Sequence, residues 1–141
     1  MHLASDEARR RFALEPVARL ATVRPDGRPH IVPIVFALDG ETICSAVDAK
    51  PKASGALARL RHIEANPYVS VLVDVYDDDW TRLWWARADG VAEVVADGPP
   101  RDAALRVLRV KFEQYADPRQ SFGAAIVIRV QRWTGWSAAG A

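Results

Sequence analysis

The segment AVDAKPKASGALARLRHIEANPYVSVLVDVY, residues 46–76, decides how this chain folds. Two apolar, β-branched runs enclose a short stretch with four cationic side chains, at Lys50, Lys52, Arg59 and Arg61. Most clusters of charge in proteins are solvated helix faces, and that is one interpretation of this stretch. The other interpretation is a corner between two strands that binds an anion.

The middle of this segment predicts a helix followed by a strand. Apolar residues recur at helical spacing over residues 54–65, and Asn66-Pro67 ends the helix. Its expected inward residues are Ala56, Leu57, Leu60 and Ile63, and its expected outward residues are Arg59, His62 and Glu64. The run over 68–76 alternates between two faces, as a strand does, and places Val69, Val71, Val73 and Val75 together.

Turn signals and periodicity divide the rest of the chain. On the N-terminal side the expected elements are a helix over 5–14 capped by Ser5, a strand over 17–24, a Pro-Asp-Gly turn, a strand over 28–38, an Asp-Gly turn and a strand over 42–47. On the C-terminal side they are one strand or a strand pair over 81–96, a helix from Pro99 with the stripe Leu105, Leu108, Phe112 and Tyr115, and strands over 123–131 and 132–137. Six or so mostly antiparallel strands with flanking helices predict a mainly β barrel, as one domain over residues 1–141.

Pro33 lies inside the second of these strands, where a proline has no N–H to donate to a neighbour. One explanation is that this strand is at the edge of the sheet. The other is that the backbone around Pro33 is bulged or open and faces a ligand.

Composition limits the possible partners. Lys and Arg total 19 and Asp and Glu total 18, so the net charge of +1 creates no long-range field that attracts nucleic acid or anionic lipid. The single cysteine, Cys44, has no partner for an internal disulfide, and we expect it to fill the core of a protein in a reducing compartment. The longest apolar run, 31–38, is too short to span a bilayer. We therefore expect a cytoplasmic protein.

The usual signatures of catalysis are missing from the sequence. There is no glycine-rich phosphate loop, no G-x-S-x-G, no H-E-x-x-H and no pair of cysteines. The three histidines, His2, His30 and His62, are far apart in sequence and are expected at the surface or in turns, so no metal site is predicted. No catalytic residue can be named. If the protein is an enzyme, a cofactor supplies the reactive atom.

The order of strand HIVPIVFAL, strand ICSAV, basic turn DAKPK, helix ending EANP and strand YVSVLVDVY resembles the split β-barrel superfamily of pyridoxamine-5′-phosphate oxidase. The resemblance covers nearly the whole chain. The segment DDDW…LWWARADG is the most distinctive part, and with the basic segment before it resembles deazaflavin (coenzyme F420)-dependent oxidoreductases, the flavin/deazaflavin oxidoreductases of the B type. The C-terminal RVQRWTGWSAAGA departs from pyridoxamine-5′-phosphate oxidases proper, so pyridoxamine phosphate is not the expected substrate.

The resemblance implies a homodimer with its cofactor at the subunit interface. The cofactor ring would lie against the strand over 30–36, and its phosphate would be held by basic residues after the following strand. The residues that match these positions are Pro33 and Ile34 for the ring, Lys50 and Lys52 with the Ser45 hydroxyl for the phosphate, and Trp85 and Arg87 for contacts across the interface. Arg59 or Arg61 would meet the anionic tail of F420 unless they belong to a solvated helix face.

The implied function is transfer of hydride between F420 and an electron-poor organic acceptor that the sequence does not identify. Trp84 and Trp85 are expected on opposite sides of their strand. The five tryptophans fit an interface or a core equally well. Two alternatives stay open: an FMN-binding oxidoreductase of the same fold, and a non-catalytic protein that binds a flavin or a tetrapyrrole.

Overall fold

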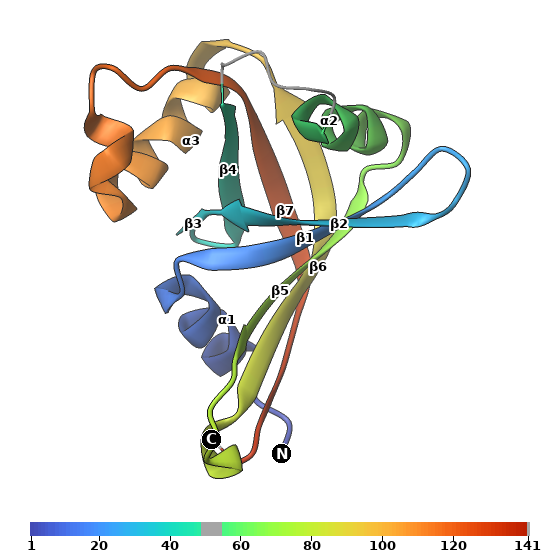
Figure 1. The fold of residues 1–141 in the computed structure, drawn as a ribbon, viewed down its shortest axis with the longest axis vertical. Helices are drawn as coiled ribbons and strands as arrows, with labels where there is room; N and C mark the ends of the chain where they lie inside the picture. Colours follow the sequence, from blue (N-terminus) through green and yellow to red (C-terminus); the bar gives the residue numbers. More distant parts are fainter. Residues whose placement is uncertain (49–54, 141) are drawn as a thin grey trace.

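The computed structural model describes residues 1–48 and 55–140 (Figure 1). Its helices are α1 (Ser5–Leu14), α2 (Gly55–Ala65) and α3 (Gly98–Lys111), with short 3₁₀ turns η1 (Trp80–Arg82) and η2 (Glu113–Ala116). Its strands are β1 (Val17–Val23), β2 (Pro29–Val35), β3 (Ala37–Asp39), β4 (Thr42–Asp48), β5 (Tyr68–Val75), β6 (Trp84–Val95) and β7 (Phe122–Ser137).

All of the strands belong to one antiparallel sheet in the order β2-β1-β5-β6-β7-β4-β3. The two edge strands, β2 and β3, follow each other in the chain and are separated only by Phe36. The sheet therefore curls until its edges meet at Phe36, although no ladder joins β2 to β3 in the described residues. In Figure 1 the strands β1 to β3 run across β4, β6 and β7, which is the arrangement of a split barrel. The mainly β prediction is confirmed.

Apolar side chains fill the space between the two parts of the curled sheet. Helix α1 contributes Phe12, whose ring lies 4.9 Å from that of Phe36 and 5.1 Å from that of Trp133. Phe12 and Phe36 are fully buried, and so are the inward side chains of the central strands, Leu20, Ile43, Val71, Val73, Ile126 and Ile128. The predicted alternation of β5 is confirmed, because Val69, Val71 and Val73 all lie in this core.

The structure corrects several predicted elements. The strand over 28–38 divides at Phe36 because the chain must turn there to pass from one edge of the sheet to the other. Residues 84–95 form one strand with a bulge between Asp89 and Gly90, and residues 122–137 also form one strand. A Cβ on Gly90 would lie 2.5 Å from the Arg129 carbonyl oxygen, so the close approach of β6 and β7 requires glycine there.

The structure also tests two predictions about single residues, the capping of α1 by Ser5 and the position of Pro33 in the sheet. Ser5 does not cap α1: the N-cap residue is Ala4, with no side-chain cap, and the Ser5 hydroxyl donates instead to the Trp133 carbonyl at 3.4 Å. Pro33 lies on β2, which pairs only with β1 in the described part of the sheet. The edge-strand explanation for Pro33 is therefore confirmed.

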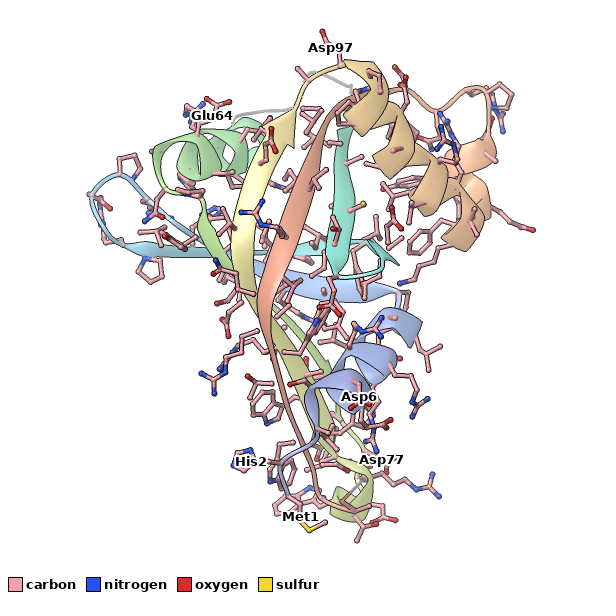
Figure 2. All side chains as sticks on the ribbon, turned by 180° about the vertical axis from the view of Figure 1, so that it is seen from behind. Met1, His2, Asp6, Glu64, Asp77 and Asp97 are labelled. Atoms are coloured by element: carbon pink, nitrogen blue, oxygen red, sulfur yellow. The ribbon has the colours of Figure 1, made fainter. Side chains whose placement is uncertain are left out.

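Helix α3 covers the outer side of β4 through a second cluster of apolar residues that includes Leu105 and Leu108. Arg101 fastens this helix to the start of β7 by donating to the carbonyls of Phe122 and Gly123 at 2.7 and 2.8 Å. Figure 2 shows Met1 and Asp77 at one end of the molecule and Glu64 of α2 and Asp97 at the other. Among the described helices, none is long and apolar enough to cross a membrane.

Candidate functional site

The outer face of β2, β1, β5 and β6 carries three of the predicted site residues. The ladder places Pro33 beside Arg19, Arg19 beside Leu72, and Leu72 beside Arg87. These four residues form one row across four strands. Because neighbouring strands are about 4.8 Å apart, Pro33 and Arg87 are separated by roughly 14 Å along the sheet. One chain therefore brings them to one face without bringing them into contact.

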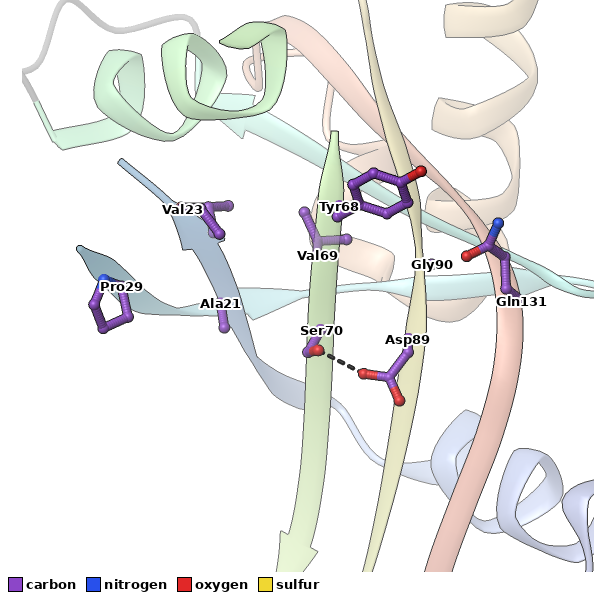
Figure 3. A pocket seen from close by; sticks show the side chains of 10 residues that line it. Ala21, Val23, Pro29, Tyr68, Val69, Ser70, Asp89, Gly90 and Gln131 are labelled. Atoms are coloured by element: carbon purple, nitrogen blue, oxygen red, sulfur yellow. Dashed lines mark hydrogen bonds between the residues drawn. The ribbon is translucent and has the colours of Figure 1, made fainter. Parts of the chain in front are cut away.

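A groove opens on this face where β1 and β5 separate (Figure 3). Their ladder ends at the pair Ala21–Ser70, and beyond this pair Val23 of β1 and Tyr68 of β5 both line the groove. The groove has a volume of about 350 Å³, near the lower end of the range for small-molecule sites. The residues that line it are Ala21, Thr22, Val23, Pro29, Tyr68, Val69, Ser70, Asp89, Gly90 and Gln131.

A chain of polar contacts borders the groove. The Ser70 hydroxyl donates to the Asp89 carboxylate at 2.5 Å, as the dashed line in Figure 3 shows, and Arg87 Nε donates to the other carboxylate oxygen at 3.1 Å. The Arg87 guanidinium also lies over the Trp85 ring, 5.7 Å from its centre. Arg87 is thus held by a carboxylate and an indole, while 41% of its side chain stays exposed.

The inner face of the same region holds a buried cluster that the sequence did not predict. His62 of α2 is only 7% exposed, and its Nδ1 lies 3.0 Å from the hydroxyl of Thr22, which is 2% exposed. The His30 ring lies edge-on to the His62 ring, with 4.8 Å between their centres. The prediction that His62 faces outward is therefore wrong. The only available signal was its place beside the inward stripe of α2, next to Ile63.

Ile34 and Ser45 lie on the inner side of the barrel. The Ile34 side chain is 5% exposed and belongs to the core, so only its main chain is available to a ring on the outer side of β2. The Ser45 hydroxyl is buried and donates to the Val35 carbonyl at 2.8 Å, which joins β4 to the end of β2. Their predicted contacts with a cofactor stay predictions.

The cationic corner is described only in part. Lys50 and Lys52 lie outside the described residues. Arg61 is exposed, as a solvated helix face requires. Arg59 is half-buried, its Nε has no hydrogen-bond partner in the described residues, and burial lowers the pKa of its guanidinium. Arg59 therefore does not fit the simple solvated-face interpretation.

The remaining residues, the single cysteine and four of the tryptophans, lie in different surroundings. Cys44 is buried beneath α3, and burial raises the pKa of its thiol to about 11, so it is an unreactive core residue as expected. Trp84 packs against the core and Trp85 lies on the outer face, as their neighbouring positions predict. Trp133 is buried, whereas Trp80 is 69% exposed. In the part of the chain that the structure describes, no three His, Cys, Asp or Glu residues gather as metal ligands would.

The fold is shared with solved structures of low sequence identity. One is conserved hypothetical protein Rv2991 from Mycobacterium tuberculosis, at 19% identity and a TM-score of 0.76, covering 96% of this chain and 86% of that one. A FAD-binding protein from Mesorhizobium loti matches at 24% identity and a TM-score of 0.71, covering 96% of this chain and 93% of that one. The FAD binding protein from Mycobacterium smegmatis matches at 18% identity and a TM-score of 0.62, covering 96% of each chain.

The curated proteins contain no significant match to this chain. The sequence model of the pyridoxamine 5′-phosphate oxidase family, by contrast, matches residues 4–137, which include every described strand. Together with the split barrel and its neighbours of the same architecture, this match identifies the chain as a member of the pyridoxamine 5′-phosphate oxidase family.

Proposed function

We propose that this protein is an oxidoreductase that binds F420 along the outer side of β2 and exchanges hydride between it and an electron-poor organic acceptor. The proposal further takes the active form to be a homodimer in the cytoplasm. Family membership supports a flavin-type cofactor, and the names of two structural neighbours refer to FAD. The resemblance of the segment DDDW…LWWARADG favours F420 within that class.

The observation that carries the proposal is the free edge of β2. The β1–β2 hairpin closes with Arg24 N–H donating to the Arg28 carbonyl at 2.8 Å. Hydrogen-bonded and non-hydrogen-bonded pairs alternate along an antiparallel ladder, so the main-chain groups of Pro29, Ile31 and Pro33 point away from β1. The two prolines have no N–H, which leaves Ile31 as the one donor between them.

This edge fits the polar edge of a flavin or deazaflavin ring. The pyrimidine part of either ring carries carbonyl acceptors and an N–H donor, and the Ile31 N–H and the three carbonyls offer the complementary set. The prolines also discourage a further strand from pairing here, which keeps the edge available. Ile31 is 63% exposed, so its side chain leaves a broad apolar surface beside this edge.

A second copy of the chain would complete the site. Trp85 and Arg87 lie too far along the sheet to meet a ring at Pro33 of their own chain. Several large side chains are more than 60% exposed and suit an interface: Ile31, Tyr68, Tyr76 and Trp80. We therefore assign Trp85 and Arg87 to the site of the partner subunit.

When bound, F420 supplies the hydride chemistry. The residues of this chain bind and orient the ring: Ile31 at its polar edge, Lys50 and Lys52 at its phosphate, and Arg87 at an anionic group. Asp89 and Ser70 keep the Arg87 guanidinium in place before a ligand arrives, which reduces the entropy lost on binding. Catalysis then depends chiefly on proximity and orientation in a site from which water is excluded.

FMN is the alternative cofactor, because the β2 edge offers the same groups to both ring systems. Titration of the purified protein with F420 and with FMN, followed by quenching of cofactor fluorescence, separates the two. We expect tight binding of F420, and clearly tighter binding of FMN would overturn this assignment.

A non-catalytic carrier of a flavin or a tetrapyrrole is the alternative from another class. Oxidation of reduced F420 in the presence of quinones, enones or biliverdin tests it. We expect turnover with at least one of these acceptors. Binding of F420 without any turnover would instead favour a carrier.

A further inference from the structure

We propose that Thr22, His62 and His30 form an acid-sensitive latch that holds the β1–β2 hairpin against α2 and thereby keeps the groove between β1 and β5 open. The three side chains come from β1, α2 and β2. Because Thr22 also lines the groove, a change in the latch reaches the outer face. This inference does not depend on which cofactor the protein binds.

The latch is the polar connection between α2 and the hairpin. The Thr22 hydroxyl and His62 Nδ1 are 3.0 Å apart, and both residues are more than 90% buried. Buried polar groups of this kind cost free energy when they lose their partner. The bond therefore favours a β1 that turns toward α2 immediately after Ala21, the last residue that it pairs with β5.

The path of β1 explains why the groove exists. From Arg19 to Ala21, β1 pairs with β5, whereas Thr22 and Val23 have no such pairing. At Thr22 the side chain is bound to α2 instead, and Val23 and Pro29 form the groove wall opposite Tyr68. Loss of the latch would release this wall from α2.

Charge makes the latch sensitive to acid. The groups that act on His62 include three cations or potential cations, Arg24 of the hairpin, Arg61 of α2 and His30 of β2, against the single carboxylate of Asp26. That carboxylate is itself paired with Arg28 at 2.7 Å. Burial first, and then His30, Arg24 and Arg61, lower the pKa of His62 below its ordinary value of 6.5, whereas Asp26 acts in the opposite direction. Protonation would also add charge beside the His30 ring, 4.8 Å away.

The sign of the effect follows from linkage. Between the lowered pKa of latched His62 and 6.5, the histidine in an open or unfolded chain binds a proton that the latched histidine does not. Acid therefore favours the open form, and the latch contributes its full stability only above that pH. His30 Nδ1 is buried without a hydrogen-bond partner in the described residues, so no neighbour shown there accepts a hydrogen bond from that nitrogen.

Hydrogen exchange measured by NMR on the full chain tests the proposal. After correction for the intrinsic pH dependence of exchange, we expect amides of α2 and of residues 22–30 to open more often at pH 5 than at pH 7. As the pH falls from the pKa of His62 in the open chain to its pKa in the latched chain, the frequency of opening can increase about tenfold for each pH unit. Amides of β7 from Trp133 onward, beyond the groove, serve as an internal reference and should change little.

Two variants distinguish the latch from a general effect of acid. Thr22→Val combined with His62→Leu removes both polar partners, and its α2 and hairpin amides should lose the acid response while the fold persists at pH 7. His2→Gln changes a histidine at the opposite end of the molecule from α2 (Figure 2) and should keep the full response. An acid response that survives in the double variant would overturn the proposal.

The titration of His62 in the unmodified protein is an independent measurement in case the double variant does not fold. Its ring proton signals should titrate below pH 6.5. A His62 that titrates at or above 6.5, or exchange that is the same at pH 5 and pH 7, would also overturn the latch.

Discussion

Two polar clusters border the same groove, and they differ in how completely the protein encloses them. In the inner cluster, Thr22 and His62 are 2% and 7% exposed and bind each other. In the outer cluster, the Arg87 and Asp89 side chains are 41% and 35% exposed, and both lie on β6. Enclosed polar contacts are costly to break, whereas exposed ion pairs contribute little to stability. The inner cluster therefore serves the fold, and the outer cluster is available for binding.

The largest expected effect is on the inner cluster. His62→Ala removes the partner of the buried Thr22 hydroxyl and leaves a cavity under α2, so the free energy of unfolding should fall by about 3 kcal/mol. Urea denaturation at pH 7.5 measures it. Arg61→Ala, an exposed neighbour on the same helix, is the control and should stay within about 0.5 kcal/mol of the original protein. A loss below about 1 kcal/mol for His62→Ala would remove the distinction between the clusters.

The next effect should appear in cofactor binding and not in stability. Lys50→Ala with Lys52→Ala removes the ammonium groups expected to hold the cofactor phosphate. Charged hydrogen bonds in a sheltered site are worth about 2 kcal/mol, so the dissociation constant should rise about 30-fold. Arg28→Ala with Arg119→Ala, which removes two exposed cations, controls for net charge. An affinity equal to that of the original protein would eliminate the proposed phosphate site.

A smaller effect concerns a half-buried cation, Lys111, at the C-terminal end of α3. Lys111 Nζ donates to the Glu15 carbonyl at 2.6 Å and lies 3.8 Å above the centre of the Phe36 ring. Burial lowers the pKa of this lysine from 10.5 to about 8. Between these two values the unfolded chain binds the extra proton, so the free energy of unfolding should rise as the pH increases from 8 toward 10.5.

Lys111→Met keeps the length of this side chain without its charge, and denaturation at several pH values should show that the rise between pH 8 and 10.5 is lost. Unlike His62, Lys111 has a carbonyl and an aromatic face as partners for its charged form. The comparison of Lys111 with His62 thus separates a group whose charged form has partners from one whose charged form is opposed by nearby positive charges. A rise of equal size in Lys111→Met would assign it to other groups.

The smallest effect on stability is expected for the outer cluster. Asp89→Asn retains the size of the side chain but removes the charge that holds Arg87 Nε, and the free energy of unfolding should change by less than about 1 kcal/mol. Cofactor affinity should nevertheless fall several-fold, because the guanidinium loses its fixed orientation. Asp89→Asn added to Arg87→Gln should cause little loss beyond that of Arg87→Gln alone. If the two losses simply add, Asp89 does not act through Arg87.

The sequence predicted those helices and strands in which apolar side chains recur along one face of the element. Helix 5–14, the alternation of residues 68–75 and the core position of Cys44 all follow from where apolar side chains recur. The opposite sides of Trp84 and Trp85 likewise follow from the period of two along a strand. Such patterns report a side chain's face and not its neighbours.

The predictions are wrong where a residue from a distant segment determines the direction of a side chain or the end of an element. His62 lies at the margin of the inward stripe of α2, and its direction depends on a hydroxyl 40 residues earlier in the chain. The division of residues 28–38 at Phe36 reflects the curl of the whole sheet, and Ser5 fails as a cap because Trp133 takes its hydroxyl. None of these partners can be read from the local pattern.

By itself, then, the sequence determined where most helices and strands lie, which side chains form much of the apolar core, and that Trp84 and Trp85 face opposite sides of their strand. Only the tertiary structure decided that β1 leaves β5 after Ala21, that Thr22 meets His62, and that Arg87 is held by Asp89 and Ser70. The physical reason is that periodicity fixes the direction of a side chain relative to its own backbone, whereas hydrogen bonds and grooves depend on how separate strands are brought together.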